Sequence, residues 1–229
     1  MSIFKPTIPR LQRGHPLARG LVGAWEFTEG SGPTAYDSSG YGNHGTLAGP
    51  PTWVGGRAGS ALSFNGTTNY VSVKRNISDD FTLSCWFKTQ SSAGSGGHWW
   101  LGKSLIDGEM PGSVNDFGTA INQGKIYFGC GNPDTNIVTS GTFNDDYWHF
   151  LAATRVRASG AMALYVDGVL TGTATSNTNS LTAPTSIEFG RPPSNYGPAY
   201  YPGMLDSVHI YNRALAAAEV SFLYALSGR

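Results

Sequence analysis

Residues 147–171 contain the feature that most constrains the fold, a run of three short β-strands joined by two tight turns. Large and small residues alternate over 149–155, and the chain turns at 158–160 and returns over 161–166. Asp167 and Gly168 form a second turn before a third strand begins at Val169. Asp-Gly between β-forming residues is a strong hairpin signal, because both central residues of a type I′ turn need positive φ. The stretch therefore predicts three successive antiparallel strands.

Other segments show the same two-residue period. Residues 81–89 alternate between an apolar face and a mixed face, as in a strand that is packed on one side. Residues 125–130 read as another strand, which we expect in the same sheet. Over 216–226, Val220, Leu223 and Tyr224 stand at helical spacing. With 31 glycines and 13 prolines available for turns, the sequence predicts an all-β protein that ends in a short helix.

The charge composition excludes several classes of partner. The formal net charge is zero and only 13% of the residues are charged. There is no overall field to attract nucleic acid or a membrane surface. No apolar run approaches the roughly 20 residues that a membrane-spanning helix needs, so we expect no membrane insertion.

Residues 1–20 differ from the rest of the chain. They contain Pro6, Pro9 and Pro16, several basic residues, and no apolar core of the kind that a secretory signal peptide carries. We expect an extended arm over 1–20, either disordered or ordered along a partner, followed by one domain over 21–229.

Several segments resemble, in the same order along the chain, the motifs of laminin-G-like, concanavalin A-like β-sandwich domains. Residues 25–30 match "W-x-F-x-E-G", and the turn cluster over 34–49 matches "A-x-D-x-S-G-x-G-N-x-G". Further matches lie in 53–66, 81–88, 147–168, 186–190 and 203–215. The resemblance implies a concanavalin A-like jelly-roll β-sandwich of two antiparallel sheets, and it places His149 in a structural "W-H" pair.

The sequence lacks the motifs of an enzyme. Glucanases that share this sandwich carry a Glu-x-Asp-x-x-Glu strand, which holds two carboxyl groups about 5–5.5 Å apart. None of the glutamates, at 26, 29, 109, 188 and 219, stands in such a strand. There is no Gly-x-Ser-x-Gly elbow and no His-x-x-x-His or Cys-x-x-Cys spacing. We expect no catalytic residue.

The resemblance implies a calcium ion as cofactor, since laminin-G-like domains often hold one. Calcium prefers six to eight oxygen ligands from a flexible loop. Asp37, Asn43 and Asp206 are the candidate ligands. The alternative is that Asp37 caps a turn and Asp206 bonds a backbone amide, with no ion. Asn69 stands where the family usually has Asp, and this weakens the metal interpretation.

Aromatic residues in two predicted loops are the candidate ligand-binding residues. They are Trp99 and Trp100 in the first loop and Tyr196, Tyr200 and Tyr201 in the second. Sugar rings stack on exposed aromatic faces, but such residues also serve as core anchors or as protein interfaces.

Two cysteines, Cys85 and Cys130, leave two arrangements open. They are either two buried thiols that pack as small apolar side chains, or a disulfide if their strands lie adjacent.

Two functions follow as expectations. The segment 13–32 resembles the start of single-domain laminin-G-like proteins of bacteriophage structural gene sets. This implies a homo-oligomeric protein on the virion surface, made in the host cytoplasm, that decorates a capsid or tail and contacts virion proteins or cell-surface glycans. The alternative is an extracellular carbohydrate-binding module of a secreted enzyme or adhesin.

Overall fold

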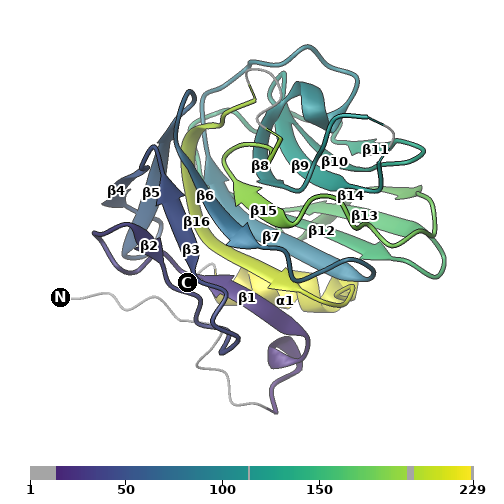
Figure 1. Ribbon diagram of the computed structural model, residues 1–229, viewed down its shortest axis with the longest axis horizontal. Coiled ribbons are helices and arrows are strands. Elements are labelled where there is room, and N and C mark those ends of the chain that lie inside the picture. Colours follow the sequence, from purple (N-terminus) through teal and green to yellow (C-terminus); the bar gives the residue numbers. More distant parts are fainter. Residues whose placement is uncertain (1–13, 113, 195–198, 228–229) are drawn as a thin grey trace.

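The computed structural model describes residues 14–112, 114–194 and 199–227. Within these ranges the strands form two eight-stranded antiparallel sheets that pack face to face (Figure 1). The predicted all-β jelly-roll sandwich is confirmed. No helix in the described ranges is long and apolar enough to cross a membrane.

The first sheet is built around β7 (Phe81–Lys88) and β16 (Pro202–Tyr211). The three successive strands predicted over 147–171 lie on one side of β7 in the order β12, β13, β14, which confirms the prediction. On the other side, β1 pairs with β16. The other strands of this sheet are β12 (His149–Val156), β13 (Ala161–Val166), β14 (Val169–Thr175), β5 (Ser60–Asn65), β4 (Thr52–Gly55) and β1 (Leu21–Trp25).

The second sheet runs in the order β11-β10-β9-β8-β15-β6-β3-β2. Residues 125–130 form β10 in this sheet, so the expectation that they share a sheet with residues 81–89 is wrong. The turn cluster over 34–49 also contains two short strands that the sequence did not predict. The bounds are β11 (Thr135–Val138), β10 (Lys125–Cys130), β9 (Phe117–Asn122), β8 (Lys103–Asp107), β15 (Ser186–Phe189), β6 (Tyr70–Lys74), β3 (Gly45–Ala48) and β2 (Thr34–Ala35).

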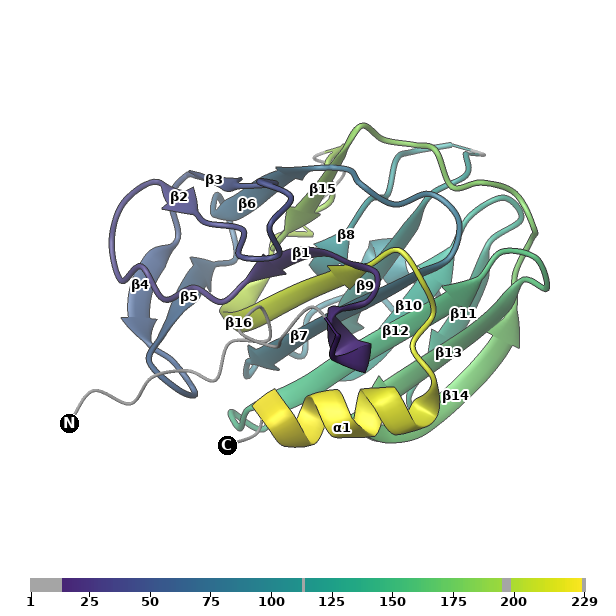
Figure 2. The same cartoon turned by 90° about the horizontal axis from the view of Figure 1, so that it is seen from below.

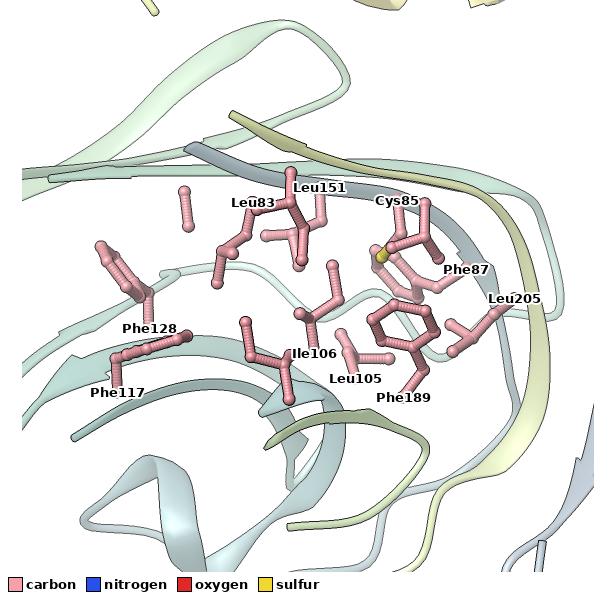
Figure 3. Close-up of a cluster of buried hydrophobic side chains, with 14 of the residues drawn as sticks. Leu83, Cys85, Phe87, Leu105, Ile106, Phe117, Phe128, Leu151, Phe189 and Leu205 are labelled. Carbon is pink, nitrogen blue, oxygen red and sulfur yellow. The ribbon is translucent and has the colours of Figure 1, made fainter. Parts of the chain in front are cut away.

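The main core lies between the two sheets (Figure 3). One sheet contributes Leu83, Cys85 and Phe87, and the other contributes Phe117 and Phe128, all fully buried. Cys85 and Cys130 are both unbridged thiols in this core, on opposite sheets. Burial raises the pKa of both thiols, so they behave as small apolar side chains.

A second cluster covers the outer face of the first sheet, where the C-terminal helix α1 (Ala217–Ser227) lies across the strands (Figure 2). Val220 and Leu223 are fully buried there, and Tyr224 stacks on Trp86 at 5.5 Å between ring centroids. The predicted short C-terminal helix is confirmed, with Val220 and Leu223 on its buried side and Phe222 exposed.

The chain before β1 differs in part from the predicted arm. A 3₁₀ turn, η2 (Pro16–Ala18), packs on the domain with Leu17 buried, and His15 stacks on Phe222 of α1. Arg213 donates hydrogen bonds to the carbonyl oxygens of Pro16 and Arg19. The folded unit therefore already includes residues 15–19, and residues 1–13 of the predicted arm lie outside the described residues.

His149 fixes the hairpin that dominates the sequence pattern. Its Nδ1 lies 2.8 Å from Oδ2 of Asp167, and its Nε2 lies 3.0 Å from Oδ1 of Asp145. Oδ1 of Asp167 also accepts a hydrogen bond from the backbone N–H of Phe150. A neutral imidazole carries one N–H, so two carboxylate partners favour the doubly protonated ring. The hydrogen bond to Asp167 and then that to Asp145 raise the pKa of His149.

This geometry predicts a pH-dependent contribution to stability. Because the folded-state pKa of His149 lies above its unfolded value of about 6.5, the contribution is complete below that pH and is lost as pH rises through the folded pKa. We expect the difference in free energy of unfolding between the wild type and His149→Gln to shrink from pH 6 to pH 9. Urea unfolding at both pH values measures it, and a constant difference would contradict a charged His149.

Candidate functional site

Trp99 lies flat on the outer face of the second sheet. Phe117, Ile121 and Phe128 point into the main core, so the alternate residues of β9 and β10 face outward. Two of these outward residues are the paired glycines Gly118 and Gly129, and the Trp99 ring occupies the space above them. A Cβ at Gly129 would lie 1.8 Å from Cε3 of Trp99. Because glycine has no side chain, Gly118 and Gly129 leave room for the Trp99 ring, and Trp99 is only 1% exposed.

Trp100 extends this aromatic group to the surface. Its ring meets Trp99 edge-on, with centroids 4.5 Å apart, and stacks against His98 at 4.0 Å. Nδ1 of His98 is held by Nδ2 of Asn136, 2.8 Å away, on the edge strand β11. The half-buried Trp100 is therefore fixed from two sides while part of its surface faces solvent.

A pocket of about 160 Å³ opens beside these two tryptophans. Its other walls come from the β8–β9 connection and from the turn between β10 and β11. The described lining residues are Trp99, Trp100, Glu109, Met110, Pro111, Gly112, Asp116 and Asp134. The pocket thus combines an aromatic wall with three carboxyl groups.

The side chains of Glu109 and Asp116 are buried and that of Asp134 is exposed, and the three carboxyl groups lie close enough to interact. Oδ2 of Asp116 accepts a hydrogen bond from the N–H of Met110 at 2.9 Å, and Oε2 of Glu109 accepts one from Ser194 at 3.3 Å. Burial, together with the negative charges of Glu109 and Asp134, raises the pKa of Asp116 to about 7. Burial also raises the pKa of Glu109. Near neutral pH the pocket can therefore accept hydrogen bonds and can also donate one.

Beneath the pocket, Asp107 lies at the end of β8 and is fully buried. Its Oδ1 accepts a hydrogen bond from the N–H of Glu109 at 2.8 Å, and burial raises its pKa well above the usual range. A Cβ at Gly118 would touch both this carboxyl group and Cδ1 of Trp99. The carboxyl group of Asp107 interacts with the hydroxyl of Ser104, whereas Nε1 of Trp99 has no hydrogen-bond partner within the described structure. A buried polar atom is seldom left in this state, so water or a ligand is expected to satisfy the indole N–H.

The structure separates the aromatic residues that the sequence grouped. Trp99 and Trp100 form the pocket wall together, although Trp99 is an anchor and only Trp100 presents a surface. Tyr201 is fully buried and its hydroxyl donates to the carbonyl oxygens of Lys88 and Met204, so the expectation of an exposed ring is wrong.

The remaining predicted tyrosines do not contribute to the described pocket wall. Tyr200 is half-buried, and its hydroxyl accepts a hydrogen bond from Arg191, which also lies 3.4 Å over the ring of Tyr70. Tyr200 thus belongs to a cluster beside β15 (Ser186–Phe189), and Tyr196 lies outside the described residues.

Protein donors already engage the first predicted calcium ligand. Asp37 Oδ1 accepts from the N–H groups of Ala24 and Ser39, at 2.9 and 2.8 Å. Its Oδ2 accepts from the N–H of Asn43 and the hydroxyl of Ser39, both at 2.8 Å. An ion at Asp37 would have to displace these bonds.

The other two predicted calcium ligands are also engaged. Nδ2 of Asn43 donates to the carbonyl oxygen of Val22, and Oδ2 of Asp206 accepts from the N–H of Arg57 at 3.2 Å. In the part of the chain that the structure describes, no three His, Cys, Asp or Glu side chains group in a way that could hold a metal ion. An ion at this trio would compete with these hydrogen bonds, and calcium binding by Asp37, Asn43 and Asp206 stays a prediction.

A larger cleft of about 880 Å³ lies at the end of the sandwich near Asp79 and Arg157. Its charged side chains are used within the protein. Arg157 lies 3.4 Å from Asp79, and Arg75 donates to the carbonyl oxygen of Leu181 at 2.6 Å. None of its described lining residues is aromatic. The smaller pocket, which has an aromatic wall held by its neighbours, is the better candidate.

Glu109, Asp116, Asp134 and Asp107 were not predicted as site residues. They come from one strand end and two connections, and they meet only because β8, β9 and β10 are neighbours in the second sheet. The one signal in the sequence was the density of glycine and acidic residues in 107–118.

Comparisons with known proteins agree with this architecture. Residues 65–221 match Laminin_G_3, described as the concanavalin A-like lectin/glucanases superfamily. No curated protein matches the chain.

Solved structures with the same fold include binding domains. Domain 4 of AbnA, a GH43 extracellular arabinanase from Geobacillus stearothermophilus, in complex with arabinotriose, superposes with a TM-score of 0.72 at 20% identity, covering 89% of this chain and 98% of that one. The binding domain of Paraclostridial Mosquitocidal Protein 1 gives 0.74 at 18% identity, covering 91% of this chain and 52% of that one.

A third structure is the binding domain of botulinum neurotoxin DC in complex with rat synaptotagmin II. It gives a TM-score of 0.70 at 14% identity, covering 91% of this chain and 52% of that one. This chain spans about half the length of the two toxin binding domains. At these identities the similarity shows a shared fold.

Proposed function

This chain belongs to the concanavalin A-like lectin/glucanases superfamily, and from that premise we propose that it is a non-catalytic domain that binds carbohydrate in the Trp99–Trp100 pocket. The observation that carries the proposal is the meeting of an aromatic wall and three carboxyl groups in one small pocket. A sugar ring has an apolar face of C–H groups and a rim of hydroxyls. The C–H face stacks on an aromatic ring, and the hydroxyls donate hydrogen bonds to carboxylate oxygens.

The fold comparison supports a binding role. One structure of the same fold is a domain of an extracellular arabinanase in complex with arabinotriose, and others are binding domains of toxins. The pocket volume of about 160 Å³ is below the range of about 300–1,000 Å³ typical of sites for drug-sized ligands. We expect it to accept one terminal sugar ring, with the rest of the glycan lying outside.

Replacing Trp100 by alanine tests this function. We expect Trp100→Ala to weaken binding of a glycan identified on an array by at least about tenfold, because the stacking surface is lost, in line with the roughly 1.4 kcal/mol that such a change requires. Calorimetric titration measures it, with thermal unfolding as a check on folding. Tyr147→Ala is the control, since Tyr147 is an aromatic residue that is 73% exposed and is not among the described lining residues of the pocket.

The control variant should bind the glycan as the wild type does. Incubation of the glycan with the wild-type protein should release no reducing ends. Undiminished binding by Trp100→Ala would contradict the assignment of the pocket, and steady release of reducing ends would contradict a non-catalytic role.

The setting of the domain remains a prediction from the sequence. A virion surface with homo-oligomers, and an extracellular enzyme or adhesin, would both use a glycan-binding sandwich of this kind. The pocket geometry serves either carrier equally.

A further inference from the structure

We propose that the pocket prefers sugars that carry a protonated primary amine, such as glucosamine units, and rejects sugars that carry a carboxylate. This inference rests on the proposed carbohydrate function and names the class of sugar. It is drawn from the charges that line the pocket, from the buried polar groups at its base, and from its aromatic wall.

The first argument is charge. Three of the described lining side chains, Glu109, Asp116 and Asp134, are carboxylic acids, and none of the described lining residues is lysine or arginine. Charges interact strongly in a pocket that holds little water. A uronic or sialic acid would meet carboxylates with no basic partner, whereas an ammonium group would meet several acceptors.

The second argument is the buried base of the pocket. Asp107 is fully buried beside the edge of Trp99, and its carboxyl group interacts with the hydroxyl of Ser104. Nε1 of Trp99, a residue of the pocket lining, has no hydrogen-bond partner within the described ranges. Burial raises the pKa of Asp107 well above its usual range, so Asp107 adds a neutral polar group and no further negative charge, and the indole N–H offers a donor for a ring hydroxyl. The site therefore includes buried polar groups and is more than a cluster of acidic residues at the surface.

The third argument is the aromatic wall. Aromatic faces attract cations, and the attraction grows when water is excluded. Trp100 is held by Trp99 on one side and by His98 on another, so its ring is already oriented. An ammonium group needs no fixed coordination geometry, and this suits a set of acids that forms no metal-type grouping among the described residues.

Binding of a cation also has a consequence for protons. The titratable groups around Asp116 come from three places. Asp107 and Glu109 lie at and after the end of β8, Asp134 lies in the turn between β10 and β11, and Cys130 lies on β10. The burial of Asp116, and then the negative charges of Glu109 and Asp134, raise its pKa to about 7. A bound ammonium group lowers this pKa, so binding at pH 6 should release a proton from the pocket.

The test is calorimetric titration of the full chain at pH 6.0 with a glucosamine tetramer, cellotetraose, the N-acetylated tetramer and tetragalacturonate. We expect at least tenfold tighter binding of the glucosamine tetramer than of cellotetraose, and no measurable binding of tetragalacturonate. Repeating the titration in buffers of different ionisation enthalpy should reveal proton release. Asp116→Asn and Glu109→Gln should each reduce the preference to under threefold and leave cellotetraose binding within threefold.

Asp80→Asn is the control, because Asp80 lines the other cleft. Thermal unfolding checks that each variant folds. If a variant does not fold, the wild type is titrated in 0.3 M salt instead, where we expect the preference for the glucosamine tetramer to weaken. Equal binding of the glucosamine tetramer and cellotetraose would overturn the amine preference and leave the proposed function intact. Binding of none of the four sugars would overturn both. Equal binding of Nα-acetyl-lysine amide would overturn the assignment to a sugar.

Discussion

Replacement of Gly129 by alanine is expected to abolish glycan binding and to lower the free energy of unfolding by about 2–4 kcal/mol, because the added methyl group occupies the seat of Trp99. The ideal Cβ position lies 1.8 Å from Cε3 and 2.4 Å from Cδ2 of the ring. Gly129 is the last residue but one of β10, and its φ lies outside the left-handed region. The cost therefore arises from lost space alone, and Trp99 must leave its buried position.

Gly55→Ala is the matched control for this variant. Gly55 ends the edge strand β4, also lacks a left-handed φ, and a Cβ there meets nothing within 4 Å. We expect its stability to stay within about 0.5 kcal/mol of the wild type. Urea unfolding and glycan titration measure both variants. Wild-type glycan affinity in Gly129→Ala would contradict the role of the glycine pair in forming the pocket.

Replacement of Arg155 by methionine is expected to destabilise the fold by about 3 kcal/mol without changing the pocket. Arg155 is fully buried at the end of β12. Its guanidinium donates to the carbonyl oxygens of Asp79, Asn177 and Asn179, at 2.9, 2.9 and 2.8 Å. Methionine retains the apolar stem, so the expected loss reflects three carbonyl groups left without their donor.

Arg157→Met is the control for the charge itself. Arg157 is exposed, lies two residues further along, and contacts Asp79 at 3.4 Å and the carbonyl oxygen of Thr178 at 3.1 Å. Exposed ion pairs contribute about 0–1 kcal/mol, so we expect a loss of under about 1 kcal/mol. Denaturant midpoints compare the two variants, and equal losses would contradict the clamp role of Arg155.

The sequence predicted the parts of this fold that local patterns encode. The Asp167–Gly168 turn, the alternation over 81–88 and the helical spacing of Val220 and Leu223 each depend on neighbours in the chain. The sheet of β10 was predicted wrongly, because alternation gives the faces of a strand and carries no information about its partners.

The candidate site depends on register more than on any local pattern. Trp99 is an anchor because Gly118 and Gly129 pair across β9 and β10, and the sequence pattern did not specify that register. Tyr201 was expected at the surface because it stands in a loop rich in proline and tyrosine. It turns inward just before β16, where its hydroxyl reaches Lys88. The composition of a loop predicts that most of its side chains are exposed. This prediction fails for a residue such as Tyr201, which stands where the loop leads into a strand.

The most direct test of the central claim is an amide and indole ¹H–¹⁵N spectrum of the uniformly labelled protein during titration with a glycan that binds. The six tryptophans give separate indole reporters, which single Trp→Phe variants assign. The account predicts that the indole signals of Trp99 and Trp100 shift as the glycan is added, while those of Trp25 and Trp86, buried in other clusters, stay in place. Saturable binding that leaves Trp99 and Trp100 unshifted would contradict the account.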